Sequence, residues 1–347
     1  MKFVNDLDIH NWGDFVDQNP QGNIFHTPEM YEVFSRTKGH EPHINAVIEE
    51  KGNILALLPI VTVTLKPGLM SWLTSRNIAY GSILSFPGEV GDVAVSVLLQ
   101  KYTQKSGNEA LFTEFRNLAD LTEIKPTITN SGFIYEDHLN YLIDINEPEE
   151  TVWSGFSKNT RKSIRKSFNK GIVSEEIHDS SLIPIFYDLL KKTYSRARVP
   201  LADISLFEAV FDILVPKGMA KMYLARAGFS FVAASLELPY KDVIYSWYSG
   251  YDWSARSFNA NDFLVWNILK WGTKNSKKIF DFGGAGTPSE PFGVRDFKSK
   301  FGGRLVNYGR YSFSHVPLLL EILRFVYKIF RRILLFVDKV KSFNTKN

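Results

Sequence analysis

The chain has 347 residues, of which 44% are hydrophobic and 22% are charged, and it contains no cysteine. This length suggests two domains, and the composition excludes a disordered or collagenous chain. The lack of cysteine excludes disulfides, thiolate nucleophiles, cysteine-bound zinc and iron–sulfur clusters. Such a composition is consistent with a reducing compartment.

The net charge of +4 is concentrated at the C-terminal end. Residues 316–347 contain seven Lys/Arg and two Asp/Glu, a balance of +5, which leaves −1 for residues 1–315. A nearly neutral body argues against a duplex-binding surface over the whole protein. The opening residues Met1–Asp6 turn acidic before any apolar run, and no stretch reaches the roughly 18 uncharged apolar residues of a membrane span. We therefore expect a cytoplasmic protein.

The first half of the chain is predicted to form mainly strands. A hairpin is expected from Ile44–Glu49 and Ile54–Thr64, followed by a strand near Ile78–Leu84. Val90–Lys105 has its apolar residues at helical spacing, and Ala110–Phe115 has the pattern of a further strand.

The second half repeats this order. Ala220–Ala225, Phe231–Leu238 and Val243–Ser249 are predicted as a three-strand meander, which Asn261–Lys274 follows as a helix and Lys278–Phe282 as a short buried strand. Strands, helix and strand therefore occur twice along the chain, which indicates a repeat of pattern.

A polar, proline-containing link at Asn146–Glu150 marks the expected domain boundary. We predict a first domain over residues 1–146 and a second over 147–313, with a cleft between them that is a favoured place for binding. Residues 314–347 are expected to add a basic amphipathic helix, because Val316–Val340 separates basic from apolar faces. This helix could lie on an anionic membrane surface or pack on the first domain.

The segment Ser157–Lys170 is strongly basic. At helical spacing Arg161 and Arg165 lie one turn apart, where like charges repel. A phosphate-bearing ligand would offset this repulsion. The alternative is a solvated helix whose charges pair with Glu175 and Glu176.

Two segments further along are rich in glycine. Phe280–Gly286 ends a predicted strand in glycines that allow close backbone approach to a ligand, although it is neither a Walker loop nor a dinucleotide fingerprint. Gly293–Gly303 alternates lysine with aromatic residues between glycine turns. It is expected to be a loop that holds a cation against developing negative charge, or an ordinary edge strand.

Metal-site and nucleophile motifs are absent from the sequence. The seven histidines are scattered, without an HExxH motif, and no Gly-x-Ser-x-Gly elbow occurs. His40 and His43 stand beside Gly39 and Pro42, so we expect them in a loop, and no metal site is predicted.

Nine short segments form a recognisable series along the chain up to about Phe313. They are Gly22–Pro28, Leu57–Pro59, Tyr80–Gly81, Asn159–Lys166, Thr193–Arg196, Tyr245–Gly250, Asn261–Lys274, Phe280–Gly284 and Phe297–Gly303. In their order and spacing these segments resemble the FemAB family of peptidoglycan-bridge aminoacyltransferases in the GNAT superfamily. The resemblance implies an α+β fold with two tandem GNAT-like (acyl-CoA N-acyltransferase-like) domains and mixed sheets.

The resemblance implies transfer of an aminoacyl group from aminoacyl-tRNA to an amine on a nucleotide- or lipid-linked peptidoglycan precursor, with no metal or prosthetic group. A neutral amine would attack the activated carbonyl, so we predict Glu114 as the base that takes its proton. Lys298 is predicted to stabilise the tetrahedral oxyanion. The predicted substrate-binding residues are Arg161, Arg165 and Arg196 for phosphates, Tyr248 and Phe297 for stacking on a base or sugar, and Asn261.

Two other functions remain open. In the first, the donor is acyl-CoA and the acceptor an amino sugar of surface-polysaccharide biosynthesis, since Leu111–Asn117 resembles a sister branch with that association. Tyr251–Asn261, before the central helix, lacks the glycines that bind the CoA pyrophosphate and argues against this donor. In the second, the chain is an inactive scaffold docked on the membrane, which the retained Lys298 segment disfavours.

Overall fold

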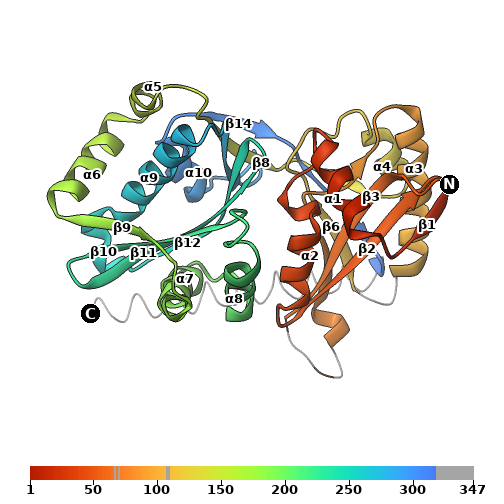
Figure 1. The fold of residues 1–347 in the computed structure, drawn as a ribbon, viewed down its shortest axis with the longest axis horizontal. Coiled ribbons are helices and arrows are strands. Elements are labelled where there is room, and N and C mark those ends of the chain that lie inside the picture. Colours follow the sequence, from red (N-terminus) through yellow and green to blue (C-terminus); the bar gives the residue numbers. More distant parts are fainter. Residues whose placement is uncertain (66–67, 69–70, 107–109, 318–347) are drawn as a thin grey trace.

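The computed structural model describes residues 1–65, 68, 71–106 and 110–317. Within these residues the chain forms two mixed β-sheets that lie side by side, each with helices on both faces (Figure 1). This arrangement confirms the predicted fold class. The expected C-terminal helix over Val316–Val340 lies almost wholly outside the described residues, so that part of the expectation stays a prediction.

The first sheet has eight strands in the order β1-β2-β3-β4-β6-β15-β7, with β5 paired to β3. Helices α3 and α4 pack on one face, and α1 and α2 pack on the other. The predicted hairpin, the strands that follow it and the helix of residues 90–105 are all confirmed. The elements are β1 (Lys2–Val4), α1 (Ile9–Gln18), α2 (Pro28–Ser35), β2 (His40–Ile48), β3 (Ile54–Thr64), β4 (Ser75–Tyr80), β5 (Leu84–Ser85), α3 (Glu89–Lys105), β6 (Phe112–Arg116), α4 (Lys125–Asn130), β7 (Ile134–Glu136) and β15 (Arg310–Ser314).

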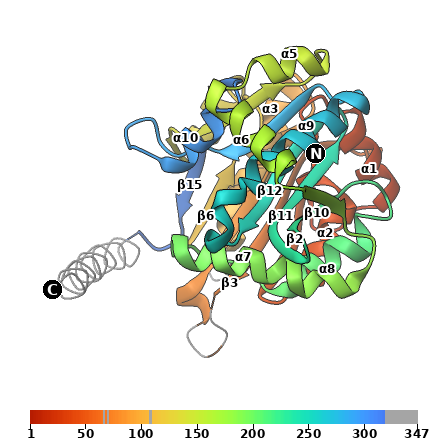
Figure 2. The same ribbon diagram turned by 90° about the vertical axis from the view of Figure 1, so that its left-hand side faces the viewer.

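The second sheet has seven strands in the order β14-β8-β13-β12-β11-β10-β9. Figure 2 shows α5, α6 and α9 above this sheet and α7 and α8 below it. The predicted meander, central helix and short strand are confirmed. The elements are β8 (Leu139–Asp144), α5 (Glu149–Ser154), α6 (Lys158–Asn169), β9 (Ile172–Glu176), α7 (Ile183–Ala197), α8 (Ile204–Ile213), β10 (Lys221–Ala227), β11 (Ser230–Tyr240), β12 (Val243–Tyr251), α9 (Ala260–Lys274), β13 (Ile279–Gly284), α10 (Gly293–Ser299) and β14 (Arg304–Asn307).

The two sheets exchange strands. Strand β8 precedes the expected boundary at residue 146 but belongs to the second sheet, where it pairs with β13 and β14. Strand β15 comes after the second sheet is complete, yet it returns to the first sheet between β6 and β7. The chain therefore crosses between the sheets twice, through residues 137–138 and 308–309. A single domain boundary in the sequence therefore cannot group β8 and β15 with the sheets to which they belong.

Two local expectations are wrong. His40 and His43 lie in strand β2 and not in a loop, because β2 extends past Pro42 to pair with β3 as far as Val63. Residues 293–299 form helix α10 and neither a loop nor an edge strand. Its side chains are placed by helical spacing, which buries Lys298 while Asp296 and Ser299 stay exposed.

Side-chain caps begin the helices nearest the predicted motifs. The Thr27 Oγ1 accepts the Met30 N–H at the start of α2, and Pro28 takes the first helical position, where no N–H is needed. The Ser157 Oγ accepts the Thr160 N–H at the start of α6. The Ser157 cap stabilises the start of α6 and so favours a helix in the basic segment despite its like charges.

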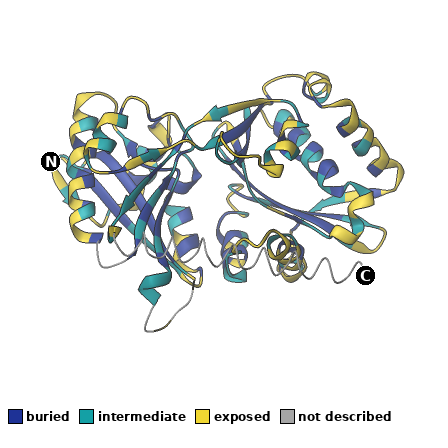
Figure 3. Ribbon diagram, turned by 180° about the vertical axis from the view of Figure 1, so that it is seen from behind, coloured by how far each residue is buried: buried dark blue, intermediate teal, exposed yellow. Residues whose placement is uncertain are grey.

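A shared hydrophobic core joins the two halves. One buried cluster contains Phe25 and Phe34 from the first half together with Phe186 and Phe207 from the second. Figure 3 shows buried residues on the strands of both sheets. In the part of the chain that the structure describes, no helix has the length and apolar character that crossing a bilayer requires.

The returning strand β15 supplies Tyr311 to the core of the first half, where it is 1% exposed. We expect Tyr311→Ala to lower the free energy of unfolding by about 3–5 kcal/mol, because a large buried ring is lost and a cavity remains. Urea unfolding followed by circular dichroism measures this change. Phe229→Ala is the matched control, since that ring is fully exposed and its loss should change stability by less than about 0.5 kcal/mol. Equal effects of the two substitutions would show that β15 is not part of the first core.

Candidate functional site

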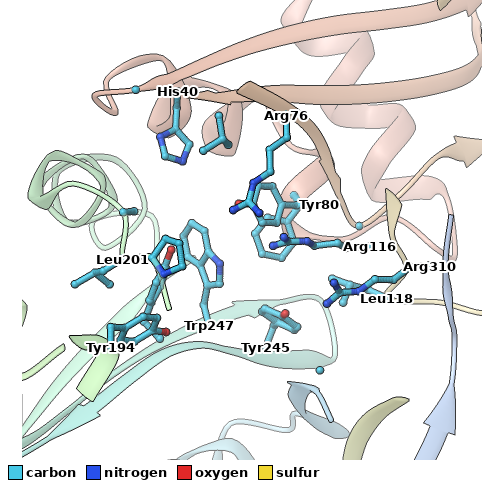
Figure 4. Close-up of a pocket in the computed structure, with 18 of the residues that line it drawn as sticks. His40, Arg76, Tyr80, Arg116, Leu118, Tyr194, Leu201, Tyr245, Trp247 and Arg310 are labelled. Carbon is cyan, nitrogen blue, oxygen red and sulfur yellow. The ribbon is translucent and has the colours of Figure 1, made fainter. Parts of the chain in front are cut away.

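A cavity of about 770 Å³ lies between the two sheets. Its lining includes residues of strands β2, β3, β4, β6 and β15 of the first sheet, of α7, β8, β12 and β13 of the second half, and of both crossing segments. Figure 4 shows the labelled side chains pointing into this space from opposite sides. A cavity of this size between two domains is a suitable place for a small-molecule substrate.

Strand β12 supplies an aromatic wall. Tyr248 pairs with Leu236 and Ser246 pairs with Glu237, so Trp247 is an extra residue without a partner in β11. This bulge interrupts the alternation of side chains, and Tyr245, Trp247 and Tyr248 all line the cavity. The Trp247 ring meets the Phe25 ring of the first half with 5.4 Å between centroids, so the wall continues across the interface.

The opposite wall carries three arginines. Arg76, Arg116 and Arg310 come from β4, β6 and β15, and Arg116 and Arg310 are directly opposite in the strand register. Glu114 lies two residues from Arg116 on the same strand face. Its Oε1 is 2.5 Å from the Arg116 Nε and 3.2 Å from an Arg310 Nη. One carboxylate therefore relieves the repulsion between two guanidiniums.

The pairing of Glu114 determines its protonation. Burial raises the pKa of this carboxyl. The positive charges of Arg116, Arg310 and Arg76 lower the pKa by more than burial raises it, so the pKa of Glu114 is below its usual value. Glu114 is therefore an ionised ligand of two arginines. As expected, Glu114 contacts residues that line the cavity. If it accepted a proton, however, it would lose its charge interaction with both guanidiniums.

The second sheet opens beside the cavity. Strand β12 pairs in parallel with β13 only from Val243 to Tyr245, after which the two strands diverge. At the end of β13, Asp281 accepts the Gly283 N–H at 2.7 Å and contacts the Asn140 amide. Burial raises the pKa of Asp281 to about 6, against the opposing effects of that hydrogen bond and of the charge on Lys298.

Lys298 of α10 holds the glycine end of β13. Its Nζ donates to the carbonyl oxygens of Phe282, Gly283 and Gly284 at 2.5, 3.2 and 2.7 Å, which engages all three ammonium protons. Burial lowers the pKa of Lys298 to about 8, with Asp281 opposing the shift. Lys298 does not line the cavity, but Gly284, which it binds, does.

Of the other predicted binding residues, only Tyr248 lines the cavity. Arg161 donates to the carbonyls of Ser154 and Phe156 at the end of α5, and Arg165 lies 5.6 Å from the Trp153 ring. These two arginines therefore serve local structure in the second domain.

The remaining predicted residues also lie outside the cavity lining. Arg196 stacks on Tyr251 and Trp253, Phe297 contacts Phe301, and Asn261 lies in the first turn of α9. The structure therefore does not bring these five residues together around one ligand position.

The alternative expectation for the basic helix was a solvated helix paired with Glu175 and Glu176, and the pairing is wrong. Glu176 pairs with Lys221 at 2.8 Å and Glu175 lies 3.6 Å from Arg226, both on β10. Among the described residues, no basic side chain of α6 forms a salt bridge with either glutamate. The charges of α6 therefore face solvent or local backbone carbonyls.

Sequence reasoning missed Arg76, Arg310 and Trp247. Arg116 could have been found, because period-two alternation in a strand puts it on the same face as Glu114. Arg310 becomes a neighbour only when β15 returns to the first sheet, and Trp247 enters through a bulge. Neither event has a local sequence signal. Within the described residues, no group of three or more His, Asp or Glu side chains is arranged to hold a metal ion.

Comparison with known proteins agrees with this architecture. Residues 154–299 match the family model described as acetyltransferase (GNAT) domain. No curated protein matches the chain. The crystal structure of FemX is similar with a TM-score of 0.70 and 15% identity, over 93% of this chain and 99% of that one.

Two further solved structures share the fold at lower similarity. L-PGS from Bacillus licheniformis has a TM-score of 0.57 and 13% identity, over 93% of this chain and 98% of that one. A tandem GNAT protein from the clavulanic acid biosynthesis pathway has 0.56 and 9%, over 90% and 98%. The chain therefore has a FemAB-like tandem GNAT fold, as the sequence resemblance implied.

The role of Glu114 can be tested by replacing it with Gln. Because its folded pKa is lowered, its stabilisation is full above the unfolded pKa of about 4.3 and is lost as pH falls through the lower folded pKa. We expect Glu114→Gln to cost about 2 kcal/mol at pH 7 and progressively less as pH falls below the unfolded pKa, as measured by urea unfolding. Glu32→Gln, in an exposed pair with Arg36, should change little over the same pH range. A cost that does not depend on pH would contradict this role.

Proposed function

We propose that the protein is a FemAB-like acyltransferase that forms an amide on a cell-envelope precursor. The observation that carries the proposal is the opening between β12 and β13, which meets an arginine- and aromatic-lined cavity. The acyl donor would enter the opening and the acceptor would occupy the cavity. The GNAT match and the shared fold support acyl transfer in general. The aminoacyl group and the peptidoglycan stem-peptide amine are the finer parts of the proposal.

The proposed step is attack by a neutral acceptor amine on the donor carbonyl. A C–N bond forms, the carbonyl oxygen becomes an oxyanion, and collapse of this intermediate expels the donor's ester oxygen or thioester sulfur. Holding the donor in the opening beside an acceptor in the cavity can offset about 7–11 kcal/mol of the barrier. The residues of both domains that line the cavity would fix the relative position of the substrates.

Lys298 contributes a fixed positive charge next to the end of β13. Because its three protons bind the carbonyls of residues 282–284, it also fixes the conformation of Gly283 and Gly284. A positive charge already in place costs no reorganisation when the oxyanion develops.

The pairing of Glu114 with two arginines decides which group accepts the proton of the amine. Its lowered pKa and its two arginine partners make it a poor acceptor, so we propose that water in the cavity takes the amine proton. Glu114 then acts by holding Arg116 and Arg310 in position.

Aminoacyl-tRNA is the proposed donor, and no metal or prosthetic group takes part. In a CoA-dependent site the pyrophosphate would bind at the start of the central helix. Here the first turn of α9 carries the buried Asp262, which pairs with Lys300 at 2.6 Å. Because Lys300 and Asp262 neutralise each other, the pair offers a pyrophosphate no net positive charge, and residues 251–261 supply no glycine that would bring backbone N–H groups to it.

The second candidate is acyl-CoA-dependent transfer to an amino sugar. The match of residues 154–299 to an acetyltransferase (GNAT) domain favours it. Both candidates use the same cavity and the same strand opening, so the donor distinguishes them. A peripheral position on the inner face of a membrane, through residues 316–340, is part of either proposal.

Donor identity is tested by presenting acetyl-CoA to the purified full chain in a calorimeter and a radiolabelled aminoacyl-tRNA mixture in a filter-binding assay. We expect saturable binding of aminoacyl-tRNA and no measurable heat with acetyl-CoA, because α9 offers no pyrophosphate site. Deacylated tRNA and free CoA serve as controls. Saturable acetyl-CoA binding without RNA binding would replace the first proposal with the second, and binding of neither would contradict both.

Lys298 gives a pH-dependent test of the chemistry. With a pKa of about 8, its charge is lost as pH rises through that value, so turnover should fall on the alkaline side. Lys298→Arg keeps the charge at all these pH values and should remove that decline, whereas Lys298→Ala should lower kcat by on the order of 100-fold. Lys51→Ala, an exposed turn residue, is the control. The same alkaline decline in the wild type and in Lys298→Arg would exclude this role.

A further inference from the structure

The first crossing segment places a histidine at the junction of the two sheets. The His138 backbone N–H donates to the Asn307 Oδ1 at 3.0 Å, and the His138 carbonyl accepts the Gly309 N–H at 3.1 Å. The N–H of the next residue, Leu139, donates to the Gly286 carbonyl at 2.9 Å, just beyond the end of β13. Because the second crossing segment and the glycine segment both bind this stretch of backbone, the position of His138 is fixed.

The imidazole of His138 lies beside the glycine end of β13. A Cβ atom at residue 284 would be 3.0 Å from the His138 Nε2 and 3.8 Å from an Arg310 Nη, so the glycine leaves the space in which the ring lies. His138 and Gly284 both line the cavity, and the Gly284 carbonyl is one of the three that bind Lys298. The ring therefore lies where the strand opening, the proposed donor entrance, meets the cavity.

The His138 ring is neutral and has an unprotonated nitrogen without a protein partner. Burial lowers the pKa of His138 to about 4, and the Arg310 charge acts in the same direction. Of the other charges that face the ring, Arg116 and Lys298 also lower its pKa and Glu114 raises it. Among the described residues, neither ring nitrogen forms a hydrogen bond within the chain. Since a neutral imidazole has one N–H and one acceptor nitrogen, this acceptor is available to a ligand.

We propose that His138 orients the acceptor amine by accepting a hydrogen bond from its N–H. The lone pair and the N–H bonds of an amine point in different directions, so a hydrogen bond to the ring turns the lone pair toward the donor carbonyl at the opening. The C–N bond then forms, the ring stays neutral, and the amine proton leaves to water in the cavity. Orientation of the attacking atom accounts for a large part of the rate gained by binding two substrates together. This inference rests on the proposed function, because it concerns the amine of the same reaction.

The test replaces the ring by side chains that differ in one property. Gln can place an amide oxygen near the position of the His138 Nε2, whereas Phe fills the space without an acceptor. We expect His138→Gln to keep kcat within about 5-fold of the wild type and His138→Phe to lower kcat by on the order of 100-fold, with the acceptor KM changed by less than about 3-fold in both. His178→Phe replaces an exposed histidine of the second half and should change neither constant.

Turnover is measured on aminoacyl-tRNA with a lysine-containing stem peptide and on acetyl-CoA with glucosamine, so that both candidate reactions are covered. Unfolding midpoints report whether each variant is folded. A purely structural role of the ring would give the opposite order, with Phe active and Gln impaired, and would overturn the proposal. Equal losses in folded His138→Gln and His138→Phe would also overturn it, because the ring would then act as a base that Gln cannot replace.

Modification by diethyl pyrocarbonate tests the ring without turnover. The reagent attacks an unprotonated imidazole nitrogen, so Nα-acetylhistidine, with a pKa near 6.5, should react about 10-fold more slowly at pH 5.5 than at pH 7.5. We expect His138 in the full chain to react at similar rates at both pH values, as measured by mass spectrometry of its peptide, because its ring is neutral at both.

The two measurements separate this inference from the proposed function. No modification of His138, or a 10-fold slower reaction at pH 5.5, would show that no free acceptor nitrogen faces the cavity and would overturn the role of His138 even in an active transferase. Modification of His138 in a wild-type chain that transfers no acyl group would overturn the proposed function, and the role of His138 in transfer with it.

Discussion

The pairing of Glu114 with Arg116 and Arg310 is the interaction on which the candidate site depends. Two guanidiniums directly opposite each other in neighbouring strands repel, and this repulsion destabilises the strand pairing at this register unless a carboxylate lies between them. Glu114 supplies it from the same strand face as Arg116. The carboxylate that could have been a catalytic base is thereby committed to holding two cations at the cavity wall.

In the second sheet, buried charged side chains also hold a backbone segment next to the cavity. Divergence of β12 and β13 leaves the end of β13 without a neighbouring strand on one side. The Lys298 ammonium binds the carbonyls of residues 282–284 at this end of β13, and Asp281 binds the Gly283 N–H from within the strand. Backbone groups that are not paired in a sheet need such partners when they are buried. The strand opening is therefore a stable feature of the fold, maintained by one lysine and one aspartate that are themselves buried.

Local sequence patterns were sufficient for most of the elements but not for the site. The hairpin of β2 and β3, the meander of β10 to β12 and helices α3, α6 and α9 all have periodicity or caps within their own segments. Helix α10 was not predicted because the glycines and the proline nearby favour a loop. Burial of Lys298 against β13 stabilises this short helix instead. Long-range pairing cannot be read from such windows. Arg310 reaches Arg116 only through the return of β15, and no spacing within either segment indicates it.

The strand exchange also connects the position of the domains to the shape of the cavity. Both crossing segments contribute lining residues, His138 from the first and Gly309 from the second, and Arg310 follows directly in β15. A shift between the sheets would move the arginines of the first sheet relative to the aromatic wall on β12 of the second. Rotation is opposed further by the core shared between Phe25 and Trp247 and by the Lys241 ammonium, which binds the carbonyls of Val16 and Asn19. Since the interface is held by packing, hydrogen bonds and two covalent crossings, the arginine wall and the aromatic wall face each other before any ligand binds. Preorganisation of this kind lowers the entropic cost of bringing a charged acceptor to its position.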